Sequence, residues 1–194
     1  MGHSQTEKAA SRERVLRLAA RKIREEGVSR PSIADLMNEA GLTHGGFYKH
    51  FASRDEFIAQ AAAAALADGS AKMEKAAQLN KAAPRAGLIK AYLSKQHRDA
   101  PGAGCALVTL GAAAGRSDAQ FKDAYEHQVR TYLDLLAGLT QEPDSDETRN
   151  ESLLVLSALV GAVLMARAVA DPELSEEILS GVAAELERLG TARS

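Results

Sequence analysis

A short basic and aromatic segment carries the side chains of this chain that are best suited to bind a partner. Around the apolar pair Phe47 and Phe51, polar and small residues occupy the positions that a helix turns away from those rings. These outward positions hold Thr43, His44, Gly45, Tyr48, Lys49 and His50. Lysine donates hydrogen bonds to guanine, helix-start amides attract phosphate, and glycine permits a close approach. The pattern therefore predicts binding in the major groove of DNA.

Two short helices and a tight turn are expected to position these side chains. Ser32, followed three residues later by Asp35, resembles a capping box and predicts a helix start. One face of that helix is apolar, with Ile33, Leu36, Met37 and Ala40. Gly41 is expected to end it, because glycine tolerates the left-handed backbone of a helix stop. Thr43 is then expected to cap the second helix.

Another helix is predicted ahead of this pair, from Ser11 to Glu26, with Gly27 as its stop. Its apolar stripe is formed by Val15, Leu18, Ala19 and Ile23. The opposite face holds Arg14, Arg17, Arg21 and Arg24, which we assign to solvent. Residues 1–10 are polar, and two interpretations stay open for them: an arm that follows DNA, or a frayed terminus.

The run LTHGGFYKHFASRDEF, from Leu42 to Phe57, resembles the DNA-binding segment of the tetracycline-repressor (TetR) family. The positions that match the family pattern are Thr43, Gly45, Gly46, Phe47, Tyr48, His50, Phe51 and Arg54. The likeness covers roughly residues 11–60, and beyond that only helical character and length agree. Pro31 stands where the family often has Thr or Ser, and Met37 replaces a common alanine.

The resemblance implies a role for each residue of a DNA-binding site. Phosphates would be bound by Thr43, Tyr48, His50 and Arg54, whereas His44, Gly45 and Lys49 would face base edges. The full predicted set is Ser32, Thr43, His44, Gly45, Tyr48, Lys49, His50 and Arg54. Phe47 and Phe51 are assigned to the core.

Composition favours an all-α protein. Apolar residues make up 45% of the 194 residues but aromatic residues only 4%, and Ala and Leu, which favour helix, dominate. Residues 1–60 hold ten Lys and Arg against eight Asp and Glu, whereas the rest of the chain is acidic, which agrees with DNA at the N-terminal end. We expect about nine helices in two domains: a three-helix helix-turn-helix domain over residues 1–54, and a ligand-binding and dimerisation domain over residues 55–194.

The predicted body begins with a long Ala-rich helix from Arg54 to Leu79, which would join it to the DNA-binding end. The further predicted helices are Arg85–Arg98, Cys105–Ala114, Asp118–Leu139, Leu153–Ala170 and Pro172–Leu189. A single Cys excludes an intramolecular disulfide and fits a reducing cytoplasm. No charge-free apolar run reaches about 18 residues, so no membrane partner is expected.

The last two helices carry more apolar surface than one chain is expected to bury. A second copy is the predicted partner, through a four-helix interface that the family resemblance also implies. The predicted interface residues are Leu153, Leu156, Val160, Leu164, Leu174, Ile178, Val182 and Leu186. Twofold symmetry would then require a roughly palindromic operator. The alternative, in which both helices pack only within one chain, stays open.

The resemblance also implies a repressor with a pocket for a small-molecule inducer among the middle helices, which shifts the population to a form that no longer fits the operator. The predicted lining is Tyr92, His97, Cys105, Leu107, Leu110, Phe121, Tyr125, Gln128 and Tyr132. No metal site and no cofactor are predicted.

Two other functions stay open, and a third, catalysis, is not expected. Cys105 follows PGAG and opens a predicted helix, which suggests thiol-based sensing of electrophiles or oxidants. A helix-turn-helix that contacts protein instead of DNA would make the chain a helical adaptor. An enzyme is not expected, because the sequence has no GxGxxG, P-loop or HExxH motif and no nucleophile paired with a base.

Overall fold

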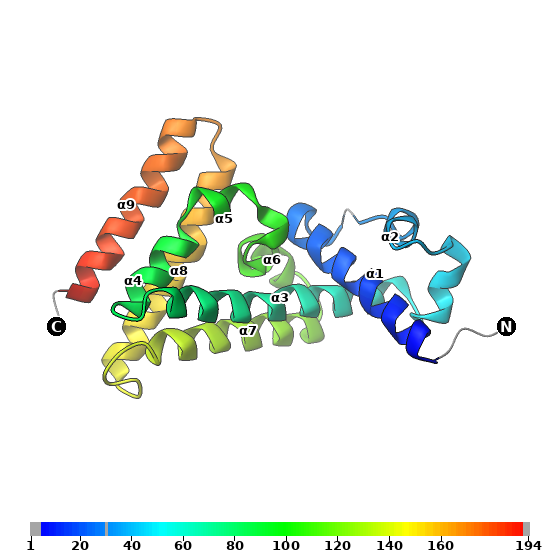
Figure 1. The fold of residues 1–194 in the computed structure, drawn as a ribbon, viewed down its shortest axis with the longest axis horizontal. Helices are drawn as coiled ribbons and strands as arrows, with labels where there is room; N and C mark the ends of the chain where they lie inside the picture. Colours follow the sequence, from blue (N-terminus) through cyan, green and yellow to red (C-terminus); the bar gives the residue numbers. More distant parts are fainter. Residues whose placement is uncertain (1–4, 30, 192–194) are drawn as a thin grey trace.

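The computed structural model describes residues 5–29 and 31–191. Nine α-helices and two 3-10 helices account for the regular structure of these residues, and no strand occurs among them. The all-α prediction is thus confirmed. Figure 1 shows a smaller head, which carries the N-terminus, at one end of an elongated molecule, and a larger helical body at the other end, with one long helix running from head to body.

The head consists of α1 (Gln5–Glu26), α2 (Ile33–Glu39) and the 3-10 helix η1 (His44–Lys49). α1 begins at Gln5, six residues before the predicted start, because the intervening residues are mostly good helix formers that need no buried face. The part of the predicted arm over residues 1–4 lies outside the described residues. Gly27 and Gly41 have φ angles of 82° and 72°, as the predicted helix stops require.

The second helix of the pair differs from its prediction. Residues 44–49 form a 3-10 helix, and the side chain of Thr43 makes no capping hydrogen bond. Two glycines in succession, Gly45 and Gly46, each weaken an α-helix by roughly 1 kcal/mol relative to alanine. A six-residue segment with that handicap adopts the tighter helix that proteins use in short pieces.

Three phenylalanine rings hold this 3-10 helix against the long helix. Phe47, Phe51 and Phe57 are all buried, and their ring centroids lie 5.3 Å (47–51), 5.4 Å (47–57) and 4.6 Å (51–57) apart. The guanidinium of Arg12 lies 5.1 Å from the centroid of the Phe51 ring. The predicted core positions of Phe47 and Phe51 are therefore confirmed.

The long helix α3 (Arg54–Leu79) has the predicted bounds and passes from the head into the body (Figure 1). The other helices of the body are α4 (Pro84–Tyr92), α5 (Lys95–Asp99), η2 (Pro101–Ala103, a 3-10 helix), α6 (Ala106–Ala114), α7 (Ala119–Ala137), α8 (Asp146–Ala168) and α9 (Pro172–Thr191). α3 packs against α4 and α7, and α8 packs against α9. The predicted segment Leu153–Ala170 begins seven residues too late.

The prediction of one helix over Arg85–Arg98 is wrong, because the helix is interrupted at Leu93 and Ser94, between α4 and α5. The Ser94 hydroxyl donates to the carbonyl of Ala91 at 2.8 Å and accepts from the amide of His97 at 3.1 Å. Ser94 has an extended backbone and so caps α5 after ending α4. The break turns His97 toward the interior of the body.

Arg24, predicted to face solvent, is buried at 5% exposure. Its Nε donates to the carbonyl of Gly102 at 2.7 Å, and its Nη1 lies 3.3 Å from the carbonyl of Ala65 and 3.1 Å from Oδ2 of Asp68. The backbone carbonyl of Arg24 accepts from the hydroxyl of Thr109 at 2.9 Å. The C-terminal turn of α1 is therefore bonded to α3, η2 and α6.

α8 is the one described helix that is long and apolar enough to cross a membrane by length and composition. This is weak evidence, because the core helix of a soluble protein passes the same test. Val155, Leu159 and Val163 of α8 are buried in the helical body.

A capping prediction follows for α3. The Ser53 hydroxyl accepts from the amide of Glu56 at 3.1 Å, and the Glu56 carboxylate accepts from the amide of Ala52 at 3.0 Å. We expect Ser53→Ala to lower the free energy of unfolding by about 1 kcal/mol in urea titrations. Ser53→Asp keeps an acceptor at the cap and should leave it within about 0.5 kcal/mol of the parent. Equal losses in both variants would contradict this.

Candidate functional site

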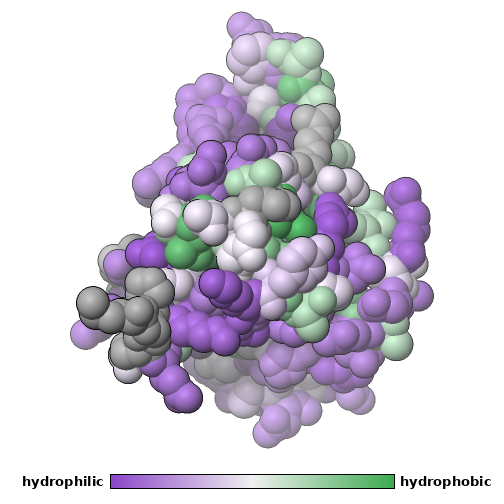
Figure 2. Space-filling model, turned by 90° about the vertical axis from the view of Figure 1, so that its right-hand side faces the viewer, coloured by the Kyte–Doolittle hydropathy of each residue, from purple (hydrophilic) through white to green (hydrophobic). Residues whose placement is uncertain are grey.

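The exposed side of η1 displays most of the residues that the sequence singles out. Tyr48 is 73% exposed, and its ring meets the buried ring of Phe47 edge-on at 5.2 Å. The neighbouring Lys49 and Gly45 are exposed as well. The head faces the viewer in Figure 2, where hydrophilic surface surrounds a central group of white and green, more hydrophobic residues. The buried Phe47 thus fixes the position of η1, and the side chains of Tyr48 and Lys49 extend from it into solvent.

The other predicted DNA-binding residues surround this centre. Thr43, Ser32 and Arg54 are exposed, at the start of η1, α2 and α3 respectively. The Ser32 hydroxyl caps α2, as predicted, by accepting from the amide of Asp35 at 3.4 Å. His44 opens η1, but the predicted role of its side chain lies outside what the structure describes.

His50 sits at the edge of this surface among cations. Its backbone carbonyl accepts from Nε of Arg12 at 3.3 Å, and its ring Nδ1 is buried without a partner among the described residues. Burial lowers the pKa of His50, and the charges of Lys8, Arg12 and Lys49 lower it further. Three cations close enough to act on one imidazole form a positive environment that favours phosphate.

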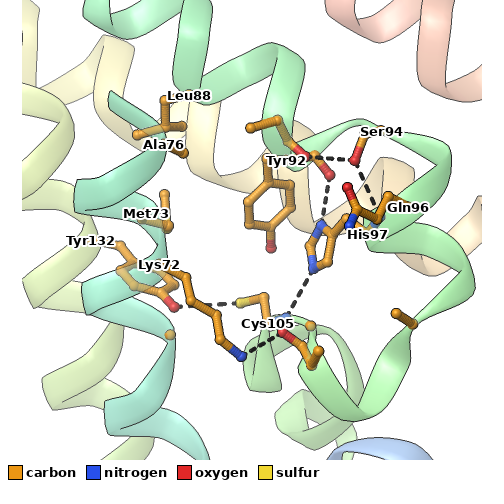
Figure 3. Close-up of a pocket in the computed structure, with 15 residues that line it drawn as sticks. Lys72, Met73, Ala76, Leu88, Tyr92, Ser94, Gln96, His97, Cys105 and Tyr132 are labelled. Carbon is orange, nitrogen blue, oxygen red and sulfur yellow. Dashed lines mark hydrogen bonds between the residues drawn. The ribbon is translucent and has the colours of Figure 1, made fainter. Parts of the chain in front are cut away.

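The body contains a partly open cavity of about 300 Å³. It lies between α3, α4, α5, η2 and the start of α6, with Tyr132 of α7 at one side (Figure 3). Its lining is formed by Gly69, Lys72, Met73, Ala76, Leu88, Ala91, Tyr92, Ser94, Gln96, His97, Ala100, Ala103, Gly104, Cys105 and Tyr132. Most of these are apolar, as in small-molecule sites generally.

The structure brings four of the predicted pocket residues together in this lining: Tyr92, His97, Cys105 and Tyr132. The other five, Leu107, Leu110, Phe121, Tyr125 and Gln128, lie outside it. Leu107 and Leu110 are core residues of α6, and Phe121 packs against the core. The Tyr125 hydroxyl donates to the carbonyl of Leu107 at 3.3 Å, and Nε2 of Gln128 donates to the Ser70 hydroxyl at 2.8 Å.

Sequence reasoning missed the wall that α3 supplies. Gly69, Lys72, Met73 and Ala76 recur at helical spacing on one face of α3 and all line the cavity. That spacing was visible in the sequence, but an Ala-rich helix offers small residues on every side, so the face was not distinguished.

His97 ties two walls of the cavity together. Its Nδ1–H donates to the carbonyl of Tyr92 at 2.6 Å, while Nε2 accepts from the amide of Cys105 at 2.9 Å, as dashed lines in Figure 3 show. These two bonds require the neutral ring with its proton on Nδ1. Burial lowers the pKa of His97. The hydrogen bond to the Tyr92 carbonyl raises this pKa, but the charges of Arg167 and Lys72 lower it further.

Cys105 lies at the start of α6 with its thiol in the wall of the cavity. The thiol lies 3.7 Å from the Tyr132 hydroxyl, to which it donates. Burial raises the pKa of Tyr132 and of Tyr92, so both phenols stay protonated at neutral pH. The Tyr92 hydroxyl has no hydrogen-bond partner among the described residues.

The loop that closes the cavity is bonded to the head. Nζ of Lys72 donates to the carbonyl of Ala103 at 2.6 Å, and Nε of Arg24 donates to the carbonyl of Gly102 at 2.7 Å. An added Cβ at Gly102 would lie 2.2 Å from Oε1 of Glu25, so glycine permits the close approach of η2 to α1. A shift of this loop therefore acts directly on the C-terminal turn of α1.

The outer face of α8 and α9 displays part of the predicted dimer interface. Leu153, Leu164 and Leu174 are exposed, and Val160, Ile178 and Val182 are half-buried. The sequence did not single out Leu154 and Met165, which are exposed beside them. Leu156 and Leu186 are instead buried within the protomer, because α8 and α9 pack against the body on that side.

No group of three His, Cys, Asp or Glu side chains lies close enough to hold a metal ion in the portion of the chain that the structure covers.

Comparisons with known proteins agree with this geometry. Residues 15–61 match the family model described as bacterial regulatory proteins, tetR family. A TetR-family regulator from Cytophaga hutchinsonii has a similar structure at 16% identity, with a TM-score of 0.76 over 96% of this chain and 97% of that one. A TetR regulator from Chloroflexus aurantiacus J-10-FL is 20% identical, with a TM-score of 0.72 over 94% of this chain and 97% of that one.

The reduced form of E. coli NemR is also similar, at 18% identity with a TM-score of 0.73 over 92% of this chain and 97% of that one. No curated protein sequence matches the chain. The structural likenesses, all below 25% identity, show a shared fold that extends over nearly the whole chain.

The neutral state of His97 makes the stability of the folded chain depend on pH. Its folded pKa lies below the usual 6.5, so below pH 6.5 the unfolded chain takes up a proton that the folded chain does not. The free energy of unfolding should therefore fall as the pH is lowered from 7 to 5. We expect His97→Gln to reduce this slope in urea titrations, whereas His127→Gln, at an exposed position, should retain it. An unchanged slope in His97→Gln would show that another group carries the effect.

Proposed function

We propose that this chain is a TetR-family transcription regulator, a cytoplasmic repressor that binds a palindromic DNA operator and leaves it when a small molecule enters the cavity. The observation that carries the proposal is the surface of η1. There Tyr48 and Lys49 are exposed and directly follow the buried Phe47, within the segment that matches the family model.

On DNA, we assign Tyr48, His50, Thr43 and Arg54 to phosphates, and His44, Gly45 and Lys49 to base edges. Ser32 would lie beside a phosphate at the start of α2, where free amides attract anions. The cations near His50 support this assignment, because phosphate contacts supply most of the binding free energy. The DNA-binding unit would comprise residues 1–54 and the ligand-binding and dimerisation unit residues 55–194.

The proposed dimer joins the outer faces of α8 and α9 of two copies. Exposed Leu153, Leu164 and Leu174 would be covered, and Gly161 leaves room for a close approach, since an added Cβ there meets no atom within 4 Å. Val160, Ile178 and Val182 would complete the contact, while Leu156 and Leu186 would support it from inside the protomer. Two heads related by a twofold axis require two half-sites.

Release from DNA would follow from the bonds between the cavity and α1. A ligand that binds better when η2 is displaced shifts the population toward that form. Because Gly102 is bonded to Arg24 and Ala103 to Lys72, the displacement changes how α1 and α3 meet. The spacing of the two heads then no longer matches the operator.

Selection of bound fragments from random duplex DNA tests the proposal. We expect enrichment of one palindrome, with log binding constant against log salt falling at a slope of roughly −5 if the dimer neutralises about six phosphates. Tyr48→Ala or Lys49→Ala should abolish retention of the enriched duplex. Lys90→Ala, which removes an exposed lysine from α4, is the matched control and should retain it.

Two outcomes would count against the proposal. Enrichment of a sequence without symmetry would contradict the dimer. Weak retention of every duplex even at low salt would favour a helical adaptor, whose head binds protein.

A second candidate function is thiol-based sensing through Cys105, favoured by the position of its thiol in the cavity wall. We expect N-ethylmaleimide to modify the native protein, with the sulfur adding to the alkene and the thiol proton passing to the adjacent carbon. Retention of the duplex should then be lost in the parent and kept in Cys105→Ser. A thiol that stays unmodified, or a modified protein that still binds DNA, would rule this function out.

A further inference from the structure

The cavity contains a buried hydroxyl that nothing in the described chain pairs with. Tyr92 is 6% exposed, and its phenolic oxygen has no hydrogen-bond partner among residues 5–29 and 31–191, because the nearby Cys105 thiol donates to Tyr132 instead. Figure 3 shows its ring reaching into the cavity with the hydroxyl directed toward Cys105. An unpaired buried hydroxyl destabilises a folded protein, so such groups call for a functional explanation. A bound molecule that pairs with this hydroxyl supplies one.

Two phenolic protons remain available at this end of the cavity. Both ring nitrogens of His97 are occupied, and the Ser94 hydroxyl both donates and accepts within the wall. The Tyr132 oxygen accepts from the Cys105 thiol, which leaves its own proton to donate, and the Tyr92 hydroxyl has its proton free as well. A ligand that brings acceptors to this end of the cavity can pair with both protons.

The charge of the lining points the same way. Lys72 is the one charged side chain in the described lining, which contains no Asp or Glu. It donates to the carbonyl of Ala103, so the ammonium has further protons to share. Burial and the charge of Arg24 lower the pKa of Lys72, whereas the charge of Asp68 raises it. The Asp68 carboxylate forms its ion pair with Arg24 and not with Lys72. The ammonium thus lacks a counter-ion inside the cavity.

Apart from Gln96, the rest of the lining is apolar, and the cavity is small. Met73, Ala76, Leu88 and Ala91 contribute much of the apolar lining, and Figure 3 shows Ala76 and Leu88 at the end of the cavity away from the Lys72 ammonium. A volume of about 300 Å³ lies at the low end of the roughly 300–1,000 Å³ of small-molecule sites.

We propose that the cavity binds a small monocarboxylate with an apolar body. Its carboxylate accepts a hydrogen bond from the Tyr92 hydroxyl and faces the Lys72 ammonium, while its body lies against Met73 and Leu88. This assignment rests on the proposed function, since it names the chemical class of the inducer.

Calorimetry on the full chain without DNA tests it with three probes that share one apolar body: 3-phenylpropanoate, 3-phenylpropanamide and 3-phenylpropylamine. We expect the acid to bind at least tenfold more tightly than the amide, and the amine not to bind. Tyr92→Phe should weaken the acid roughly tenfold or more, the effect of removing a hydrogen bond to a charged group. Because it removes an unpaired hydroxyl, this variant should be no less stable than the parent.

Lys72→Met should bring the affinity for the acid down to that for the amide. The matched controls are Lys75→Met, at a lysine of α3 that is exposed like Lys72 but does not line the cavity, and Tyr125→Phe, outside the lining. Both should leave the acid affinity unchanged.

The proposal is overturned if the amide or the amine binds as tightly as the acid, if Tyr92→Phe has no effect on the acid, or if none of the three binds at millimolar concentration. If the chain retains the selected duplex but binds none of the probes, the proposed regulator stands and the proposed ligand class is refuted. If the chain binds the acid but retains no duplex, the proposed regulator is refuted and the carboxylate site stands.

Discussion

The architecture depends on one buried cation, Arg24, at the end of the first helix. A guanidinium at 5% exposure is tolerated only where its donors are satisfied, and here they reach the carbonyls of Gly102 and Ala65 and the carboxylate of Asp68. Removing one member of a buried charged group leaves the others uncompensated and typically costs 3–5 kcal/mol. The partially exposed Asp68 reduces that figure, but the backbone partners are buried. The head is therefore held to the body by directional bonds as well as by apolar packing.

This constraint explains why the loop over residues 99–105 is compact. Gly102 comes so close to α1 that an added Cβ would collide with the Glu25 side chain, and at Gly104 an added Cβ would lie 2.8 Å from Nη2 of Arg167 and 3.0 Å from the His97 ring. Arg167 in turn donates to the carbonyls of His97 at 2.6 Å and Arg98 at 3.0 Å. The loop thus lies between Arg24 from the head and Arg167 from α8. The Gly102 carbonyl of the loop accepts from Arg24, and the carbonyls of His97 and Arg98, just before the loop, accept from Arg167.

Much of this fold was predictable, because the sequence carries strong local signals. Ser32, Ser53 and Asp118 each precede a helix that they cap, and Gly27 and Gly41 end helices with a left-handed backbone. What the sequence did not reveal depends on contacts between distant residues. Arg24 follows the spacing of an exposed arginine stripe, yet it is buried because Gly102, 78 residues later, supplies a carbonyl. The break at Ser94 is, by contrast, a local feature, because its hydroxyl bonds to the Ala91 carbonyl and the His97 amide.

The candidate cavity was only half predictable for the same reason. The aromatic and sulfur-containing residues Tyr92, Cys105 and Tyr132 stand out in a chain with few aromatic side chains, and they do line it. Five other predicted residues do not, since the inward faces of α6 and α7 fill the core between α3 and α8 instead. Periodicity identifies which face of a helix is buried but not whether that face meets a neighbour or a void.

Position within the fold gives the cavity its connection to the head. Two successive carbonyls of η2 are bonded to two different helices, Gly102 to α1 through Arg24 and Ala103 to α3 through Lys72. Lys72 belongs to the cavity lining, whereas Arg24 belongs to the head, and after burial it is the charge of Arg24 that lowers the pKa of Lys72. If the proposed carboxylate pulled the Lys72 ammonium toward the cavity, it would lengthen the bond from Lys72 to the Ala103 carbonyl. The loop on which the Arg24 anchor depends would then loosen, and this would be the route by which the proposed ligand changes the position of the head.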